Sequence, residues 1–197
     1  MGEITRPKSD GTYMALLDFM NRESLTDKGD ILEIGAFCGN FTRLLADTFK
    51  NRMVYAVDVF QPDYDKVMGD LYVEWLAGTQ QLVEYQRNIA GLKNVVTLMC
   101  DSTLLPNNVR FSNGIKIAYI DGGHSYEAVR IDFAFAWVHL KANGLMVIDD
   151  YAHDLPDVTR AVDEGMNHLL SAERNTKYWH LPELKSFAVR KEPRSDN

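Results

Sequence analysis

Short apolar runs alternate with longer amphipathic segments along most of this chain. The apolar runs, rich in Val, Ile, Leu and Met, occupy residues 31–35, 53–58, 95–100, 115–121 and 144–149. Runs of this length and composition are typical of parallel strands that are buried on both faces. The amphipathic segments have apolar residues at helical spacing over 13–21, 41–49, 71–90, 126–140 and 158–172. This alternation predicts an α/β fold in which helices cover both faces of a parallel sheet.

The chain ends with two further strand patterns, over 178–181 and 185–190. They are short and close together, so we expect an antiparallel hairpin at the edge of the sheet. With the five earlier strands they predict a doubly wound, mostly parallel seven-stranded sheet. The sequence contains no internal repeat and no linker-like stretch, which predicts a single domain over 1–197, with a helical extension over about 1–28 and a tail over 191–197.

Composition and charge disfavour several classes of partner. Hydrophobic residues make up 46% of the chain and charged residues 25%, close to the globular average, and no apolar run approaches the roughly 20 residues that span a bilayer. The net charge of −7 disfavours a nucleic-acid partner, which needs a concentrated basic face. Cys38 and Cys100 fit no zinc or redox spacing, which favours reduced thiols and a cytoplasmic location. We therefore expect a soluble protein that acts on a small molecule, with the oligomeric state, including a homo-oligomer, left open.

The segment after the first predicted strand is a glycine loop. Gly35 and Gly39 are separated by three residues and lie between a strand and a helix. The first glycine permits a sharp turn, and the second permits a ligand to approach the backbone. A dinucleotide fingerprint reads G-x-G-x-x-G, and Phe37 occupies the position of its second glycine. A pyrophosphate would meet this bulky side chain, so the loop favours a cofactor without a phosphate and disfavours an NAD-dependent dehydrogenase.

Three acidic residues accompany the first three strand patterns. Glu33 lies in the first strand, Asp58 ends the second and Asp101 follows the third. Asp58 is placed to bind the two hydroxyls of a ribose, and Asp101 would lie near an adenine amino group. Glu33 can accept hydrogen bonds from loop amides or, through water, from a cationic amino-acid cofactor. The alternative is that each acid caps the helix that follows it; behind a glycine loop, the three together favour a nucleoside cofactor.

These motifs resemble those of a known enzyme family. The segments Glu33–Gly39, Val57–Asp58 and Cys100–Ser102 are similar to the successive cofactor motifs of class I S-adenosylmethionine-dependent methyltransferases. The segments Tyr119–Val129 and Trp137–Tyr151 resemble one branch, the small O-methyltransferase-like proteins grouped with antibiotic-pathway and sugar O-methyltransferases. The resemblance runs from about residue 31 to about residue 162. It departs at position 143, an asparagine where the family often has a second glycine, and in an N-terminus shorter than that of members with a substrate lid.

The resemblance implies a Rossmann-like methyltransferase fold and S-adenosylmethionine as the cofactor. The residues that it assigns to the cofactor are Glu33, Gly35, Ala36, Phe37, Gly39, Asp58, Val59, Asp101, Ser102 and Asp121. It also implies methyl transfer to a hydroxyl of a small molecule, a sugar or a phenol. The alternative is a non-catalytic module that keeps the nucleoside site, because the short N-terminus offers little material for a substrate lid.

Three carboxylates follow the fourth and fifth predicted strands. Asp121 ends the fourth strand, and Asp149 and Asp150 end the fifth. Because neighbouring parallel strands end at the same edge of a sheet, we expect the three to converge and to repel one another unless a cation or protons neutralise them. Oxygen ligands suit Mg²⁺ or another oxygen-preferring divalent cation, and related O-methyltransferases use such an ion to hold a substrate hydroxyl. The alternative is that Asp121 and Asp150 cap helices and bind no metal.

Two histidines are candidate general bases. His124 follows two glycines and would stand at the start of the next helix, facing the methyl group of the cofactor. An ordinary histidine pKa of about 6.5 suits it to take a proton from a hydroxyl; the alternative is that it anchors the loop by hydrogen bonding to a strand-end carboxylate. His153, three residues after Asp150, is a second candidate base or ligand. Together with Asp121, these histidines are the predicted catalytic residues.

Overall fold

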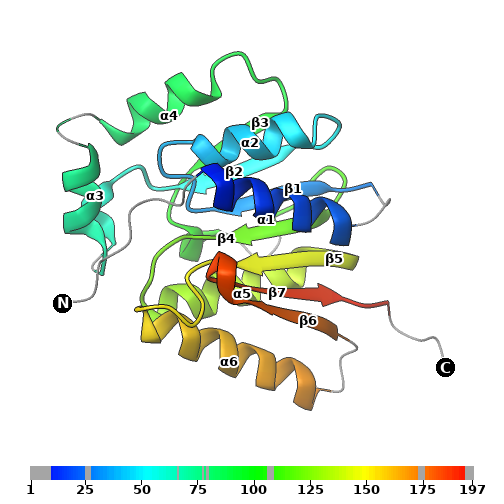
Figure 1. Ribbon diagram of the computed structural model, residues 1–197. Helices are drawn as coiled ribbons and strands as arrows, with labels where there is room; N and C mark the ends of the chain where they lie inside the picture. The colour runs from blue at the N-terminus through cyan, green and yellow to red at the C-terminus, as the bar shows by residue number, and fades with distance from the viewer. Residues whose placement is uncertain are drawn as a thin grey trace.

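A computed structural model describes residues 10–24, 28–65, 67–76, 78, 80–105, 109–172 and 176–193 of the chain (Figure 1). Its helices are α1 (Asp10–Glu23), α2 (Asn40–Thr48), α3 (Gly69–Leu76), α4 (Gln81–Ile89), α5 (Tyr126–His139) and α6 (Pro156–Ser171). Its strands are β1 (Asp30–Ile34), β2 (Val54–Asp58), β3 (Val95–Met99), β4 (Ile115–Ile120), β5 (Leu140–Ile148), β6 (Thr176–Leu181) and β7 (Ser186–Lys191). Short 3-10 helices lie in the connections: η1 (Pro62–Tyr64), η2 (Ser102–Leu104) and η3 (Pro182–Leu184).

The strands of this part of the chain form one sheet in the order β3-β2-β1-β4-β5-β7-β6. β1 pairs in parallel with β2 and β4, and the parallel pairing continues outward to β3 and β5. β7 pairs antiparallel with both β5 and β6. The doubly wound, mostly parallel sheet and its C-terminal antiparallel hairpin are therefore confirmed. The strand order reverses between β1 and β4, and sheets of this kind bind ligands outside the carboxyl ends of the strands at that point.

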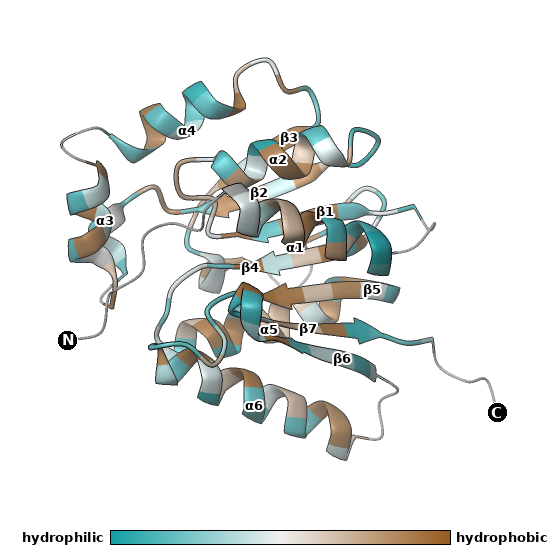
Figure 2. Ribbon diagram, viewed as in Figure 1, coloured by the Kyte–Doolittle hydropathy of each residue, from teal (hydrophilic) through white to brown (hydrophobic). Residues whose placement is uncertain are grey.

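Alternate residues of each strand contribute to different hydrophobic clusters, because side chains alternate between the two faces of a sheet. On β1, Ile31 packs with α1 and α2, through Leu17 and Leu45, whereas Leu32 packs with the α5 residue Phe133. The side chains of these two β1 residues and of their three helix partners are all buried. Figure 1 shows α1 and α2 in front of the sheet and α5 behind it, and Figure 2 shows the hydrophobic colour along most of β5 and the first part of β7. The two helix layers fix the strands, and with them the loops that leave their carboxyl ends.

The segment 71–90, expected as one helix, forms two. α3 ends at Leu76 and α4 begins at Gln81. Gly78 between them has a φ of 83°, in the left-handed region that ends a helix. The apolar spacing is helical on both sides of the break, so the sequence pattern did not reveal it.

Asn143 lies in a turn of the backbone within β5, which begins at Leu140 and not at the expected residue 144. Its φ is 57°, in the left-handed region. Asparagine is one of the few residues other than glycine that adopts this conformation at little cost. Asn143 therefore adopts a conformation that favours glycine, at the point where the pairing of β5 with β4 is irregular.

The described part of the N-terminal extension is helical, as expected. α1 packs Leu16, Leu17 and Met20 against the sheet, so it is part of the hydrophobic core. Residues 1–9 and 25–27 of the extension, and residues 194–197 of the tail, lie outside the described residues. None of the described helices has both the length and the apolar character that crossing a membrane requires.

Candidate functional site

Two cavities open at the carboxyl ends of the parallel strands. The larger, of about 400 Å³, lies over the ends of β1 to β4 and is called the wide cavity. The smaller, of about 280 Å³, lies over the ends of β1, β4 and β5 and is called the narrow cavity. Gly35, Phe37, Tyr72 and Asp121 line both. The two cavities therefore meet at these four residues.

Gly35 lets the loops after β1 and β4 pass one another in close contact. Its φ is 89°, and a Cβ at this position would lie 1.9 Å from the carbonyl oxygen of Asp121. Gly39, with a φ of 78°, begins α2 against the ring of Tyr85, 2.8 Å from where a Cβ would stand. The predicted glycine loop therefore needs both glycines, one for a backbone crossing and one for a turn against an aromatic ring.

Glu33 places an unpaired carboxylate oxygen beside the narrow cavity. The side chain is 1% exposed, and its Oε2 accepts a hydrogen bond of 2.6 Å from the hydroxyl of Thr42. Its Oε1 has no hydrogen-bond partner among the described residues. Burial raises the pKa of Glu33 to about 8, although the Thr42 hydrogen bond opposes that shift. The site therefore contains a buried acceptor that a cationic ligand group would satisfy.

Asp58 holds the loops around the wide cavity together. Its Oδ2 accepts from the backbone N–H of Phe37 at 2.8 Å, and its Oδ1 accepts from the N–H of Phe60 at 2.6 Å and from Gln81 Nε2 at 3.1 Å. Burial raises the pKa of Asp58, and these hydrogen bonds oppose the increase. The carboxylate lies at the end of β2, where the sequence predicted it, and it lines the wide cavity.

Asp101 caps the short helix that follows β3. Its Oδ1 accepts from the backbone N–H of Thr103 at 2.9 Å and from the Thr103 hydroxyl at 2.8 Å, and its Oδ2 accepts a short hydrogen bond from the Tyr64 hydroxyl. Burial alone would raise the pKa of Asp101, but these hydrogen bonds lower it below its ordinary value. Asp101 therefore makes the contacts of a helix cap, which was the alternative to cofactor binding for these acids. Asp101, Ser102 and Val59 all line the wide cavity.

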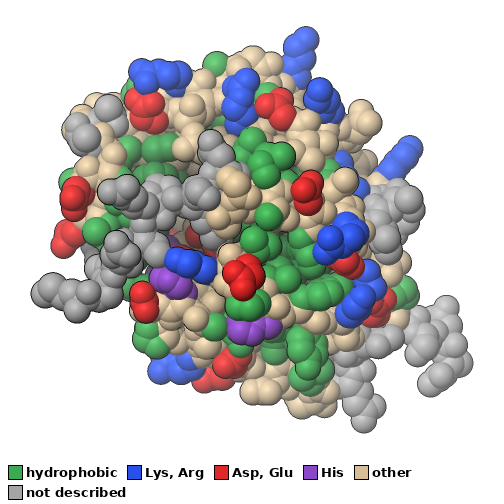
Figure 3. All heavy atoms as spheres, in the orientation of Figure 1, with side chains coloured by type: hydrophobic (Ala, Val, Ile, Leu, Met, Phe, Trp, Pro, Cys, Tyr) green, Lys and Arg blue, Asp and Glu red, His purple; other side chains and the backbone are tan. Residues whose placement is uncertain are grey.

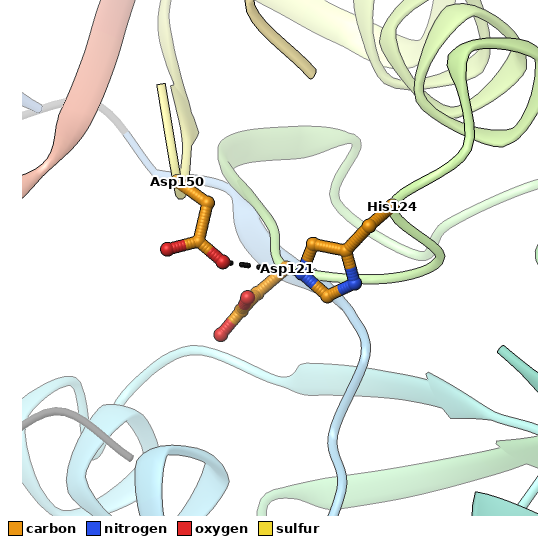
Figure 4. Close-up of side chains that lie close together, drawn as sticks. All are labelled: Asp121, His124 and Asp150. Carbon is orange, nitrogen blue, oxygen red and sulfur yellow. Dashed lines mark hydrogen bonds and ion pairs between the residues drawn. The ribbon is translucent and has the colours of Figure 1, made fainter. Parts of the chain in front are cut away.

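Asp121, His124 and Asp150 form a compact cluster between the two cavities (Figure 4). Each offers a ligand atom, and these atoms all lie within 4.8 Å of one another. Asp121 follows β4, His124 precedes α5 and Asp150 follows β5. The topology thus joins two loops, the one between β4 and α5 and the one after β5, which are adjacent because β4 and β5 are neighbours.

His124 is held by carboxylates on both sides of its ring. Nδ1 lies 2.6 Å from Asp65 Oδ2, and Nε2 lies 3.1 Å from Asp150 Oδ2. Burial lowers the pKa of His124, but the hydrogen bonds to Asp150 and Asp65 and the charge of Asp121 outweigh burial and raise the pKa to about 10. In this arrangement the imidazole is a cation at neutral pH. Its hydrogen bond to Asp150 matches the alternative in which His124 anchors the loop on a strand-end carboxylate.

Asp65 is a site residue that sequence reasoning missed. It lies between η1 and α3, in a stretch without strand or helix periodicity, and its carboxylate also accepts from the backbone N–H groups of Val67 and His124. Nothing in the local sequence distinguishes it from a solvated loop acid. Only the packing of α3 against the loop after β4 brings it to His124.

Asp149 and His153, two further predicted site residues, lie outside this cluster. Asp149 is 5% exposed and accepts from the Tyr119 hydroxyl at 2.6 Å and from Ser186 Oγ at 3.1 Å. Its carboxylate lines the narrow cavity, but His124 takes its place beside Asp121 and Asp150. His153 pairs loosely with Asp154, at 3.9 Å, and lines neither cavity. The expected triad of carboxylates is thus a pair of carboxylates and an imidazole.

Aromatic rings form much of the wall of the narrow cavity. Tyr13 stacks on Phe41 with ring centroids 4.8 Å apart, and Tyr72 packs on Trp75 at 5.4 Å. All four line the narrow cavity, together with Lys185 at the end of η3. Apolar walls around a few converging polar groups are typical of small-molecule sites.

Charge on the molecular surface is mixed. On the face drawn in Figure 3, Lys and Arg side chains alternate with Asp and Glu side chains and do not gather by sign. This distribution agrees with the net charge of −7.

The fold and the site together define a class of protein. An open α/β sheet with a glycine loop after β1 and a cavity at the switch point is the Rossmann-like arrangement that binds nucleosides. Comparison with known proteins then gives the family. The methyltransferase domain family of the Methyltransf_24 type matches residues 32–151, more than half of the chain. The chain belongs to this family, within the class I S-adenosylmethionine-dependent methyltransferases.

A curated relative and several solved structures are similar to the chain. An uncharacterized protein of Acanthamoeba polyphaga mimivirus is 24% identical over 138 residues, which cover 66% of this chain and only 56% of that protein. The O-methyltransferase NovP superposes with a TM-score of 0.67 at 18% identity, covering 93% of this chain and 79% of its own. An rRNA methylase from Streptococcus thermophilus has a TM-score of 0.62 at 18% identity, covering 98% of this chain and 100% of its own. These structures share the fold and differ in what they methylate.

Proposed function

We propose that this protein is an O-methyltransferase that transfers a methyl group from S-adenosylmethionine to a hydroxyl of a small molecule, a sugar or a phenol. The observation that carries the proposal is the Asp121–His124–Asp150 cluster, because Asp121 and Asp150 line an aromatic-walled cavity directly beside the glycine loop. One structural neighbour, CalS11, is described as a TDP-rhamnose 3'-O-methyltransferase, with a TM-score of 0.59 at 17% identity, covering 92% of this chain and 79% of its own. The net charge of −7 supports a small acceptor over a nucleic acid.

The residues around the glycine loop suit the cofactor. Glu33 offers its unpaired Oε1 to the ammonium group, and Gly35, Ala36 and Phe37 line the narrow cavity beside it, while Gly39 lets the loop turn into α2. Asp58 and Val59 would contact the ribose, and Asp101 and Ser102 the base, in the wide cavity. When bound, S-adenosylmethionine supplies a methyl group on a positively charged sulfur, which leaves as a thioether.

The protein aligns the acceptor and removes its proton. The narrow cavity holds the acceptor hydroxyl next to the point where both cavities meet, at Asp121. Alignment of the two reactants is the main catalytic requirement of such a displacement. The carboxylate pair of Asp121 and Asp150 takes up, on one of its oxygens, the single proton that the acceptor hydroxyl loses. The His124 cation, between Asp65 and Asp150, stabilises the negative charge that develops on the acceptor oxygen as its proton leaves.

A divalent cation fits the same cluster. Asp121 and Asp150 supply two carboxylates, and Mg²⁺ is commonly bound by one or two carboxylates with water completing its shell. Asp149, whose oxygens already accept from Tyr119 and Ser186, would orient the loop behind Asp150. When bound, Mg²⁺ would supply stabilisation of the developing alkoxide. His153 keeps no role in this scheme, because its ring faces Asp154.

The test is a methyl-transfer assay with purified protein, S-adenosylmethionine and a panel of sugars, phenols and catechols, with Mg²⁺ or with EDTA. We expect S-adenosylhomocysteine to form with a subset of the panel, EDTA to slow the reaction, and Asp121→Asn to slow it by about a hundredfold or more. Asp157→Asn, on the exposed face of α6, is the matched control. Binding of S-adenosylhomocysteine without turnover on any acceptor would instead support the non-catalytic module.

A further inference from the structure

Lys185 is the one cationic side chain among the described residues that line the narrow cavity. It is partly buried, and within the described part of the chain no acid forms an ion pair with its ammonium group. A lysine ammonium is strongly hydrated, so a partly buried and unpaired one beside a cavity is costly unless a ligand pairs with it. The proposed methyl transfer leaves this charge without a role.

The backbone holds Lys185 beside the loop that follows β5. Its C=O accepts from the backbone N–H of Tyr151 at 3.0 Å. The next residue, Ser186, donates its hydroxyl to Asp149 Oδ1 at 3.1 Å. These two contacts attach the turn between η3 and β7 to the loop that carries Asp150. The place of Lys185 at the cavity is therefore fixed by the same packing that fixes the strand-end acids.

The acids of the narrow cavity are satisfied by groups other than Lys185. Hydrogen bonds reach them from hydroxyl groups and from an imidazole ring. These contacts join Thr42 to Glu33, Tyr119 to Asp121 and Asp149, and His124 to Asp150. The remaining acid of the lining, Glu183, is exposed to solvent. Neutralisation of these acids therefore does not account for Lys185, and its charge is available to a ligand.

Lys185 lies on the side of the narrow cavity that is far from the glycine loop. It precedes β7, and β4 and β5 separate β7 from β1. Neighbouring strands are about 4.8 Å apart, so the backbone of Lys185 is roughly 14 Å from the strand that carries Glu33. Asp121 and Asp150 follow the two strands in between. A ligand whose hydroxyl lies at Asp121 therefore extends toward Lys185, while the amino-acid part of the cofactor lies beside Glu33.

The size and the walls of the narrow cavity favour a single aromatic ring. Its volume of about 280 Å³ is below the roughly 300–1,000 Å³ that are typical of pockets for drug-sized ligands. The ring of Tyr72 packs against the rings of Phe37 and Trp75, with centroids 5.1 Å and 5.4 Å from its own. The amide of the lining, Asn40, already accepts from Asn88 at 2.8 Å. A planar ring finds stacking partners here, whereas a polyhydroxylated sugar would leave hydroxyls unpaired.

We propose that the acceptor is a phenol that carries an acidic group, and that Lys185 binds this group while the phenol hydroxyl lies at Asp121. The inference rests on the proposed O-methyl transfer and narrows its acceptor from a sugar or a phenol to an anionic phenol. The lysine ammonium forms a charge-assisted hydrogen bond to the acid, and the aromatic walls hold the ring between the two ends. Lys185 thereby also decides which end of the acceptor meets the methyl donor.

The experiment is calorimetry on the protein saturated with S-adenosylhomocysteine. It measures the dissociation constants of ortho-, meta- and para-hydroxybenzoate and of the matching hydroxybenzyl alcohols. Each pair shares its ring and the position of its hydroxyl and differs in charge. We expect at least one hydroxybenzoate to bind roughly tenfold to a hundredfold more tightly than its alcohol, the range of a hydrogen bond to a charged group.

Substitutions of Lys185 separate its charge from its bulk. Lys185→Met should remove the preference, because methionine keeps much of the length and loses the charge, and Lys185→Arg should keep most of it. Lys185→Glu should reverse it in favour of the hydroxybenzylamine of the same isomer. Lys50→Met, at an exposed position after α2, is the matched control and should keep the wild-type ratio. The affinity for S-adenosylhomocysteine should be the same in Lys185→Met as in the wild type.

Equal affinities for each acid and its alcohol in the wild type, or a preference that survives in Lys185→Met, overturn the inference. A loss of S-adenosylhomocysteine affinity in Lys185→Met also overturns it, since the lysine would then bind the carboxylate of the cofactor. Methyl transfer to neutral sugars alone rejects the anionic phenol and leaves the proposed methyl transfer standing. If the wild-type protein does not bind S-adenosylhomocysteine, the proposed function fails instead.

Discussion

Glu33, which we propose binds the cofactor, lowers the stability of the fold when it is ionised. In the folded protein its pKa is raised from 4.5 to about 8 by burial. The folded state therefore holds the proton more tightly than the unfolded chain, and the stability that this provides is lost as the pH rises from about 4.5 through about 8. At higher pH the fold carries a buried charge with one unpaired oxygen.

Glu33→Gln should therefore stabilise the fold and weaken cofactor binding. We expect the free energy of unfolding to exceed that of the wild type by an amount that grows between pH 5 and pH 9, to on the order of 3 kcal/mol, because the amide does not ionise and still offers Thr42 an acceptor. Urea unfolding at several pH values measures the gain, and calorimetry with S-adenosylhomocysteine measures the loss of affinity. Glu74→Gln, on the exposed surface of α3, should change neither. A pH-independent difference between Glu33→Gln and the wild type would contradict the buried-charge explanation.

The cost of a side chain at Gly35 can be compared with that at Gly91, which has a similar φ and no neighbouring atoms around a Cβ. Gly35→Ala brings a Cβ against the carbonyl oxygen of Asp121, whereas Gly91→Ala, with a φ of 84°, meets nothing within 4 Å. We expect Gly91→Ala to cost about 1 kcal/mol, from backbone strain alone, and Gly35→Ala to cost about 3 kcal/mol or more, because the loop crossing must open. Chemical denaturation measures both. Equal costs would show that the contact with Asp121 is relieved at little expense.

α3 is attached to the site through Asp65, in the connection before it, and through the packing of Tyr72 on Phe37. Asp65 accepts from Val67 and Met68 at the start of this segment and from the ring and backbone of His124 across the site. The helix also provides Tyr72 and Trp75 to the narrow cavity. The Asp65 carboxylate thus links this cavity wall to the Asp121–His124–Asp150 cluster.

Asp65→Ala should loosen this wall without unfolding the protein. We expect faster amide hydrogen exchange over 67–76 and a loss of about 2 kcal/mol in stability, because several donors lose their acceptor. Exchange in α4, which lacks this attachment, should not change. Glu74→Ala, an exposed position on α3 itself, is the control. Unchanged exchange over 67–76 in Asp65→Ala would show that other contacts hold the helix.

Over the whole molecule, ligand binding should couple to stability. The cavities lie between loops from β1, β2, β4 and β5, so a ligand that fills them joins segments from most of the sheet. At a concentration one hundred times its dissociation constant, S-adenosylhomocysteine should add about 2.7 kcal/mol and raise the melting temperature by roughly 5–10 °C. A thermal melt with and without ligand measures the shift. No shift at millimolar S-adenosylhomocysteine would contradict the proposed use of the cofactor.

The order of strands and helices followed from local sequence, because a strand buried on both faces needs a continuous apolar run and a covering helix needs apolar residues at helical spacing. The break at Gly78 was missed, since the spacing remains helical on both sides of it. Asp65 was missed for another reason. It is a single acid in a segment without a motif, and its contact with His124 joins residues distant in the sequence.

The sequence by itself determined the α/β class, the glycine loop and the acids that end the strands, because a turn after a strand and a carboxylate beside it depend on neighbouring residues. Only the tertiary structure decided which acids act together. Pairing β4 with β5 brings Asp121 to Asp150, and the approach of α3 brings Asp65 to His124, while Asp149 turns toward Tyr119 and Ser186. Side-chain direction and contacts across loops are fixed by packing of the whole sheet, and no local pattern encodes them.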